Sequence, residues 1–239
     1  VARVQAFRNF LTRRTFAYKA RNKAMNMFSS FENFKAIRKK AEDSRKDTNR
    51  PHEVLYFHKV DDPYSHLTIH FIEKFKSTYD VKFKSILVGE ENPAALHEPS
   101  LYTDYCLEDV KRIAPFYGVD FPGIDYPKKD LVNKANAILS AVSEEEFESI
   151  AKQVSHAIWS DDQEKLNSLG ESYQTSEAEV IEKLKTGNEI RNNCDYYFGS
   201  AFYYEKELYW GVDRLNHLED RLTELGVNKT SENAPVCLL

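Results

Sequence analysis

EVLYFHKVDDPYS, residues Glu53–Ser65, is the stretch that decides the fold. Its first half is rich in Val, Leu, Tyr and Phe, which predicts a buried β-strand. The DDP of residues 61–63 follows, and a carboxylate just before proline is typical of a helix start. Apolar residues then recur at helical spacing from Tyr64 to Tyr79, which predicts a helix with one apolar face. The strand therefore leads directly into a helix, whose first N–H groups and dipole favour an anion.

The rest of the chain continues this alternation. Val81–Val88 predicts a second strand, and a strand, helix and strand joined by short connections imply parallel pairing with a right-handed crossover. Residues 100–195 are almost entirely helical in pattern, with breaks at Pro and Gly. Cys194–Trp210 predicts a β-hairpin, and a leucine stripe over residues 215–225 predicts a final helix that stops at Gly226.

The first fifty residues differ in net charge from the rest of the chain. Residues 1–50 contain 14 Lys and Arg against 4 Asp and Glu, whereas residues 51–239 contain 19 against 34. Residues 1–46 lack Pro and Gly and carry apolar residues at roughly helical spacing, which predicts a basic helical arm. One hypothesis is that its aromatic stripe packs on the acidic remainder of the chain or on a second subunit, because opposite charges attract. The alternative is that it binds nucleic acid or an anionic membrane surface.

Composition excludes several other classes of protein. No run of eighteen apolar residues occurs, so no membrane span is expected. The N-terminal residues contain no apolar segment of the kind found in secretory signals, so no secretory signal is expected. Cys106, Cys194 and Cys237 are far apart and form no C-x-x-C motif, which argues against a dithiol active site and a zinc site. We expect buried structural thiols at the first two, no metal, and a cytoplasmic location, because scattered thiols fit a reducing compartment.

Two motifs resemble one family. FHKVDDPYSHL, residues 57–67, is similar to the strand-to-helix junction of DsbA-like thioredoxin-fold proteins. It is closest to the branch of 2-hydroxychromene-2-carboxylate isomerases and kappa-class glutathione transferases. ELYWGVDRLNHLEDRL, residues 207–222, resembles the final E-L-F-W-G-Q-D-R-L motif of that branch. The two motifs stand in the expected order near the two ends of residues 51–225.

The resemblance implies an α/β fold of the thioredoxin-like type, with a long all-helical insertion between the second and third strands and a helical N-terminal extension. We therefore divide the chain into five parts. They are a basic helical arm (1–50), the first half of the thioredoxin-like domain (51–96), the helical insertion (97–195), the second half of that domain (196–226), and a tail or linker (227–239).

The chain departs from the family at the reactive position. Relatives use Ser or Cys for sulfur chemistry where this chain has Asp62, and a cis-proline where it has Ser200. A carboxylate cannot exchange disulfides and would repel a thiolate. Two roles for Asp62 stay open: a helix cap, or a general base toward a neutral substrate with Tyr64 and Ser65 as neighbours. A non-proline cis peptide costs about 3–4 kcal/mol, so we expect a trans peptide at Ser200.

The resemblance also implies a ligand site. In glutathione-binding relatives, the acidic residue of the G-x-D-R motif contacts the γ-glutamyl end of glutathione, which assigns that role to Asp213; a helix N-cap is a compatible alternative. From the pattern alone, His58 is expected in the core and His66 at the surface. The expected ligand-binding residues are Pro63, Tyr64, Asn92, Ser200, Ala201 and Asp213, beside the catalytic candidates Asp62 and Ser65.

Three functions follow as hypotheses. The first is a binding module with a degenerate site and no disulfide exchange, whose ligand is a small thiol, a peptide-like molecule or a protein. The second is a glutathione-dependent isomerase or transferase in which Asp62 replaces Ser, with glutathione as cofactor. The third is binding of an anion or nucleic acid through residues 1–50. A homodimer or an additional domain is the expected macromolecular partner.

Overall fold

The computed structural model describes residues 16–89 and 98–229, so the expected site residue Asn92 lies outside the described residues. The chain divides into two compact units, Val1–Arg50 and Pro51–Leu239, which are described separately. Within the described ranges, no helix is both long enough and apolar enough to cross a lipid bilayer.

The described part of the first unit consists of helices α2 (Phe16–Phe28) and α3 (Phe31–Asp47). The chain breaks between them because the side chain of Ser30 accepts a hydrogen bond from the N–H of Asn33, which caps α3. Along α3, the ammonium of Lys35 lies over the ring of Phe31, 4.4 Å from its centroid. This unit therefore presents aromatic rings beside basic side chains, as the pattern of the arm predicts.

The second unit is built on a four-stranded sheet with the order β2-β1-β3-β4. Strand β1 pairs in parallel with β2 and antiparallel with β3, and β3 and β4 form an antiparallel hairpin. The parallel pair that the sequence predicts is thus confirmed. The strands are β1 (Glu53–His58), β2 (Lys82–Leu87), β3 (Ala201–Tyr204) and β4 (Glu207–Trp210).

The hairpin is shorter than predicted. Its turn consists of Glu205 and Lys206, which both have positive φ, as a two-residue hairpin turn of the type I′ class requires. Residues 194–200 precede β3 without strand structure, and Asp195 and Ser200 in this segment also have positive φ. The prediction of a strand from Cys194 onward is wrong, because such backbone angles interrupt an extended chain.

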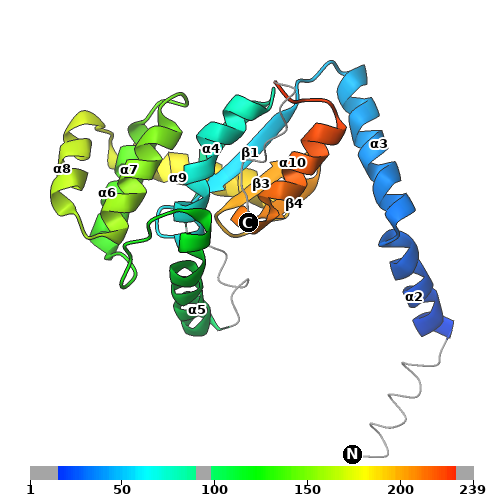
Figure 1. The fold of residues 1–239 in the computed structure, drawn as a ribbon, viewed down its shortest axis with the longest axis horizontal. Coiled ribbons are helices and arrows are strands. Elements are labelled where there is room, and N and C mark those ends of the chain that lie inside the picture. The colour runs from blue at the N-terminus through cyan, green and yellow to red at the C-terminus, as the bar shows by residue number, and fades with distance from the viewer. Residues whose placement is uncertain (1–15, 90–97, 230–239) are drawn as a thin grey trace, which may run out of the picture. The chain divides into compact units, whose positions relative to one another are not determined.

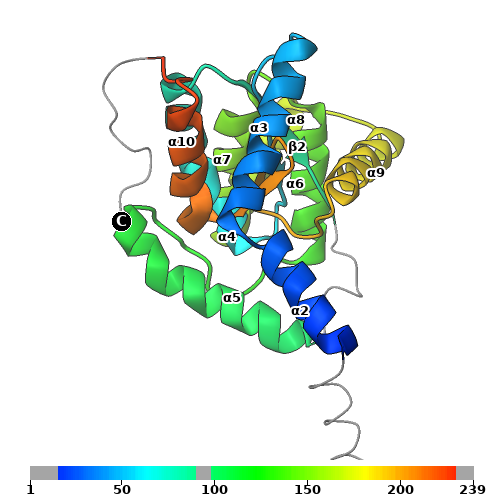
Figure 2. The same ribbon diagram turned by 90° about the vertical axis from the view of Figure 1, so that its right-hand side faces the viewer.

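Within the described residues, five α-helices lie between β2 and β3, which confirms the predicted helical insertion (Figure 1). Helix α4 packs between the sheet and α7, and α6, α7 and α8 pack on one another. Helix α5 runs along one side of the unit, below α4 in Figures 1 and 2. The helices are α4 (Pro63–Thr78), α5 (Pro99–Ile113), α6 (Lys129–Ala141), α7 (Phe147–Trp159), α8 (Gln163–Ser172), α9 (Glu177–Asn193) and α10 (Leu215–Glu224), with the short 3₁₀ helices η2 (Ala114–Tyr117) and η3 (Val212–Arg214).

Both faces of the sheet are covered. Alternate residues of β1 point to opposite faces, so Tyr56 joins the main core with α4, α7 and α10, whereas Phe57 joins a smaller cluster on the other face. The C-terminal part of α9 covers that second cluster through Ile190. Helix α9 lies close against β2 at Gly187, where a Cβ atom would overlap the carbonyl oxygen of Leu87.

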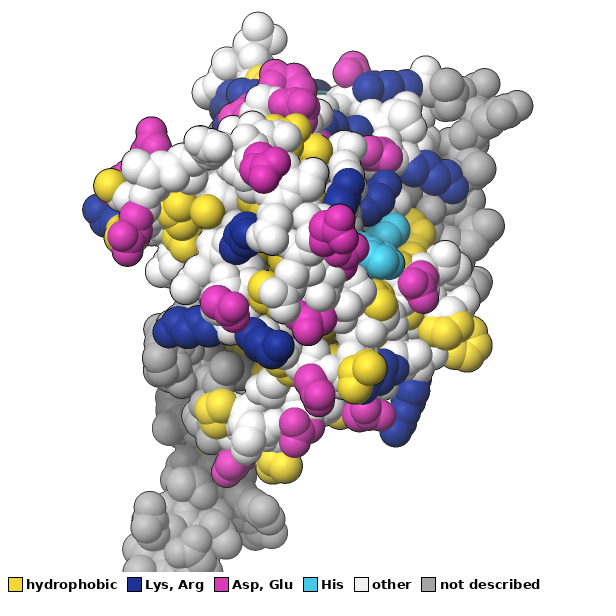
Figure 3. Space-filling model, turned by 90° about the vertical axis from the view of Figure 1, so that its left-hand side faces the viewer, with side chains coloured by type: hydrophobic (Ala, Val, Ile, Leu, Met, Phe, Trp, Pro, Cys, Tyr) yellow, Lys and Arg dark blue, Asp and Glu magenta, His cyan; other side chains and the backbone are white. Residues whose placement is uncertain are grey.

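The surface around the α6–α8 side of the unit carries mixed charges. Figure 3 shows acidic and basic side chains interspersed on this face, with single hydrophobic side chains between them. The acidic surplus of residues 51–239 is therefore not gathered into one acidic patch on this face.

Candidate functional site

Asp62 caps helix α4. Its Oδ1 accepts a hydrogen bond from the N–H of Tyr64 at 3.2 Å, and its Oδ2 accepts from the N–H and the Oγ of Ser65 at 3.0 and 2.7 Å. Pro63 opens the helix, at a position that needs no N–H donor. The predicted capping role is confirmed by these bonds. The carboxylate uses the N–H groups that would otherwise receive an anion, while its role as a base stays a prediction.

The loop at Gly199 and Ser200, where the resemblance leads us to expect the family's cis-proline, closes over this carboxylate. A Cβ atom on Gly199 would lie 2.9 Å from Oδ2 of Asp62 and 2.8 Å from Cβ of Lys59. Ser200 follows with φ 51° and a trans peptide, as expected, and its fully buried Oγ lies 2.7 Å from Oγ1 of Thr68. The loop therefore packs directly on the cap.

A cleft of about 70 Å³ remains beside Asp62, and it contains a thiol that comes from the insertion. Cys106 of α5 is 2% exposed, so it is buried, as the sequence predicts. Burial, assisted by the nearby charge of Asp62, raises the pKa of this thiol to about 11. Cys106 is consequently protonated at neutral pH and lacks the thiolate on which disulfide exchange depends.

Removing the cap tests this part of the site. We expect Asp62→Ala to lower the free energy of unfolding by about 1 kcal/mol, because two N–H groups of α4 lose their acceptor. Asp62→Asn keeps an acceptor oxygen and should retain most of that stability. Urea denaturation of the two variants beside the wild type measures the difference, and equal stability of the Ala variant would show that the cap contributes nothing.

Two histidines, one on β1 and one on α4, are buried near the junction that contains Asp62. His58 is fully buried, as predicted, and its Nδ1 lies 3.1 Å from the hydroxyl of Tyr56. His66 is also fully buried, so the expectation that it faces solvent is wrong. The insertion covers it: its ring nitrogens lie 2.9 Å from Oγ of Ser155 on α7 and 2.8 Å from the carbonyl oxygen of Asp120. Burial lowers the pKa of His58 to about 3 and that of His66 to about 4.

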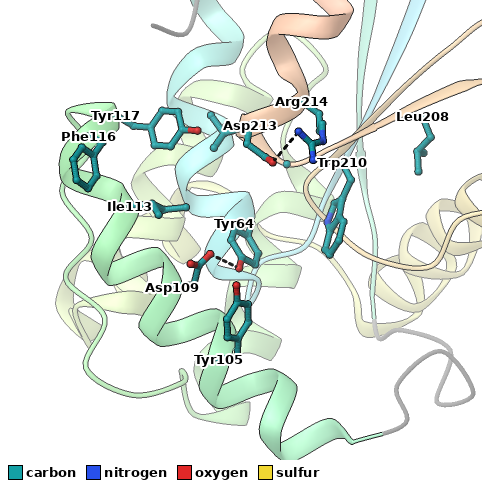
Figure 4. A pocket seen from close by; sticks show the side chains of 12 residues that line it. Tyr64, Tyr105, Asp109, Ile113, Phe116, Tyr117, Leu208, Trp210, Asp213 and Arg214 are labelled. Carbon is teal, nitrogen blue, oxygen red and sulfur yellow. Dashed lines mark hydrogen bonds and ion pairs between the residues drawn. The ribbon is translucent and has the colours of Figure 1, made fainter. Parts of the chain in front are cut away.

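A much larger cavity, about 690 Å³, lies between α5 on one side and β4 with η3 on the other (Figure 4). Tyr105, Asp109 and Ile113 line it from α5, where a spacing of four residues places them on one face of the helix. The hydroxyl of Tyr64 donates to Oδ2 of Asp109 at 2.7 Å. Burial and this carboxylate raise the pKa of Tyr64, which therefore stays a neutral donor. The remaining lining residues are Phe116, Tyr117, Leu208, Trp210, Gly211, Val212, Asp213 and Arg214.

Asp213 lies on the wall of this cavity and caps no helix. It is inside η3, whose N-cap is Gly211, while the N-cap of α10 is Arg214, without a side-chain capping bond. The alternative that Asp213 is an N-cap is therefore wrong. Its carboxylate lies 3.6 Å from the guanidinium of Arg214, and both side chains are more than half exposed. A contact with a ligand stays a prediction.

The structure thus separates the expected site residues. Asp62 and Pro63 line the small cleft, Tyr64 and Asp213 line the large cavity, and Trp210 lines both. The other three, Ser65, Ser200 and Ala201, are fully buried and line neither space. Among the described residues, no group of three or more His, Cys, Asp and Glu side chains is arranged to hold a metal ion.

The contribution of α5 was missed at the sequence level. Tyr105, Asp109 and Ile113 recur at four-residue intervals, which was a usable signal for one helix face. That signal does not show which element of the chain lies opposite this face of α5, because α5 and β4 are far apart in the sequence. Only the packing of the insertion brings the two walls of the cavity together.

No protein-family model matches the chain, and a search of curated proteins gave no match. Two solved structures are similar to it. One is a 2-hydroxychromene-2-carboxylate isomerase, with a TM-score of 0.54 and 18% identity over 73% of this chain and 96% of the isomerase. The other is a putative protein disulfide isomerase from Nitrosomonas europaea, with a TM-score of 0.54 and 14% identity over 74% of this chain and 99% of that protein.

At these identities the likeness concerns the fold. The chain has a DsbA-like thioredoxin fold, with a helical insertion in the chain between β2 and β3, and the fold class predicted from the sequence is confirmed.

Proposed function

We propose that this protein is a binding module whose ligand occupies the 690 Å³ cavity, and that it does not exchange disulfides at the start of α4. One observation carries the proposal. The carboxylate of Asp62 and the loop at Gly199 pack together at the start of α4, where the resemblance places the sulfur chemistry of relatives, while a ligand-sized cavity lies between α5 and β4. Ligand pockets usually measure roughly 300–1,000 Å³ and combine apolar walls with a few polar groups.

Binding in the cavity can be tested with a neutral apolar dye, N-phenyl-1-naphthylamine, whose fluorescence rises in apolar surroundings. We expect the wild type to bind it and Ile113→Trp, which fills the cavity from α5, to bind it at least tenfold more weakly. Ile181→Trp is the matched control, because Ile181 is 59% exposed on α9 and lines none of the cavity. Equal binding by all three proteins would refute the proposal.

The absence of disulfide exchange is tested separately. The protein should not accelerate the reduction of insulin by dithiothreitol, because the cleft offers a carboxylate and a protonated Cys106 in place of a thiolate. Catalysis that disappears in Cys106→Ser would show that the buried thiol takes over the missing chemistry, and the second half of the proposal would then fail.

A glutathione-dependent isomerase or transferase is the second candidate. The observation in its favour is that Asp213, the residue that the resemblance assigns to glutathione, lies on the cavity wall together with Tyr64. Calorimetric titration with glutathione distinguishes the two. Binding at millimolar or lower concentration that is lost in Asp213→Ala would favour the enzyme. No binding by the wild type, with binding gained in Asp62→Ser, would favour a module whose sulfur site has decayed.

A further inference from the structure

Negative side chains outnumber positive ones on the walls of the cavity. Among the described residues that line it, Asp109, Asp213 and Arg214 are the charged ones. Asp213 and Arg214 lie 3.6 Å apart and offset one another, so Asp109 determines the formal charge. Within the part of the chain that the structure describes, Asp109 forms no salt bridge; its one hydrogen bond comes from the neutral hydroxyl of Tyr64 to Oδ2. The cavity therefore carries about one uncompensated negative charge.

The same walls are rich in aromatic rings. Tyr64 meets the ring of Trp210 edge-on at 6.5 Å between centroids, while Tyr105 and Phe116 stand at an exposed rim. Figure 4 shows Tyr64 and Tyr105 converging beside Asp109. The face of an aromatic ring attracts a cation within about 6 Å of its centroid, by about 0.5–2 kcal/mol depending on desolvation. The aromatic rings and the carboxylate of Asp109 thus both favour a positively charged group.

We propose that this cavity selects an organic ammonium ligand with an apolar or aromatic body, whose cationic head lies at Asp109 among the tyrosine rings. This inference rests on the proposed function, because it names the chemical class that the cavity takes. Tyr64 occupies only Oδ2 of Asp109, so the second carboxylate oxygen can accept a bond from an ammonium or approach a quaternary one. Binding of a carboxylated ligand is disfavoured, because Asp109 repels it and the charge of Arg214 is already offset by Asp213.

Three probes that share a phenyl group and differ in charge test the inference: benzyltrimethylammonium, benzyl alcohol and phenylacetate. Calorimetric titration of the wild type at pH 7.5 should give tightest binding for the ammonium, at least tenfold weaker binding for the alcohol, and the weakest for phenylacetate. Asp109→Asn should weaken ammonium binding about tenfold and change binding of the alcohol less than twofold. Asp104→Asn, an exposed carboxylate on the same helix that lines none of the cavity, should change neither.

The outcomes separate this inference from the proposed function. If the alcohol or phenylacetate binds as tightly as the ammonium, and Ile113→Trp abolishes binding, the cavity binds ligands without preferring cations and the inference is overturned. The inference also fails if none of the three probes binds while the neutral dye does. Loss of dye binding together with all three probes overturns the proposed function as well. Because the charge series uses the wild type, it does not depend on how any variant folds.

Discussion

Replacing Gly187 by alanine will destabilise the protein by about 3 kcal/mol, although alanine is the better helix former. Gly187 lies inside α9, and an added Cβ would overlap the carbonyl oxygen of Leu87, an atom of the β2 backbone. A backbone atom in a sheet cannot rotate away as a side chain can, so the whole helix must shift from the strand. Urea denaturation followed by circular dichroism will show the loss as a lower midpoint.

Gly170→Ala is the matched control. Gly170 also lies inside a helix, α8, but the atom nearest to its added Cβ is Cε of Lys134 at 3.3 Å, at the far end of a flexible side chain. We expect this variant to equal the wild type or to exceed its stability by up to about 1 kcal/mol. Similar effects of the two substitutions would show that the contact between α9 and β2 is looser than the structure has it.

His58 and His66 together will reduce the free energy of unfolding by about 4 kcal/mol when the pH is lowered from 7.5 to 5. His58 and His66 have folded-state pKa values of about 3 and about 4, against about 6.5 in the unfolded chain. Below pH 6.5 the unfolded chain therefore binds protons that the folded chain excludes, and stability falls as the pH falls toward the folded-state values. Each histidine contributes about 2 kcal/mol to the loss at pH 5.

His58→Phe should remove about half of this pH dependence, because it replaces the buried imidazole by a ring that does not titrate. Exposed His217 provides the control, and His217→Gln should leave the dependence unchanged. The measurement is the difference between unfolding free energies at the two pH values, so a constant destabilisation of the variant cancels. An unchanged difference in His58→Phe would mean that this histidine accepts a proton in the folded state.

Much of the fold was predictable because its signals are local. Proline at residue 63 and the carboxylate before it are a local signal for a helix start, and the structure shows the cap that they predict. The parallel pair, the helical insertion and the final leucine-striped helix also followed from periodicity and connection length. The hairpin was predicted but made too long, because Ser200, which packs against Thr68 of α4, has a positive φ that interrupts an extended chain.

The site was less predictable because its contacts are distant in sequence. Nothing local to His66 indicates that α7 and Asp120 bury it, and nothing local to Cys106 places it beside Asp62. Asp213 stands before a leucine stripe, where a cap was a reasonable expectation, yet η3 directs it to the cavity.

The sequence by itself determined most of the secondary structure and the cap at Asp62. These depend on which residues are neighbours along the chain. Only the tertiary structure decided that a cavity opens between α5 and β4, which of its described carboxylates remains without a salt bridge, and that His66 is buried. Burial and charge compensation are sums over groups far apart in the chain, and folding alone brings those groups together.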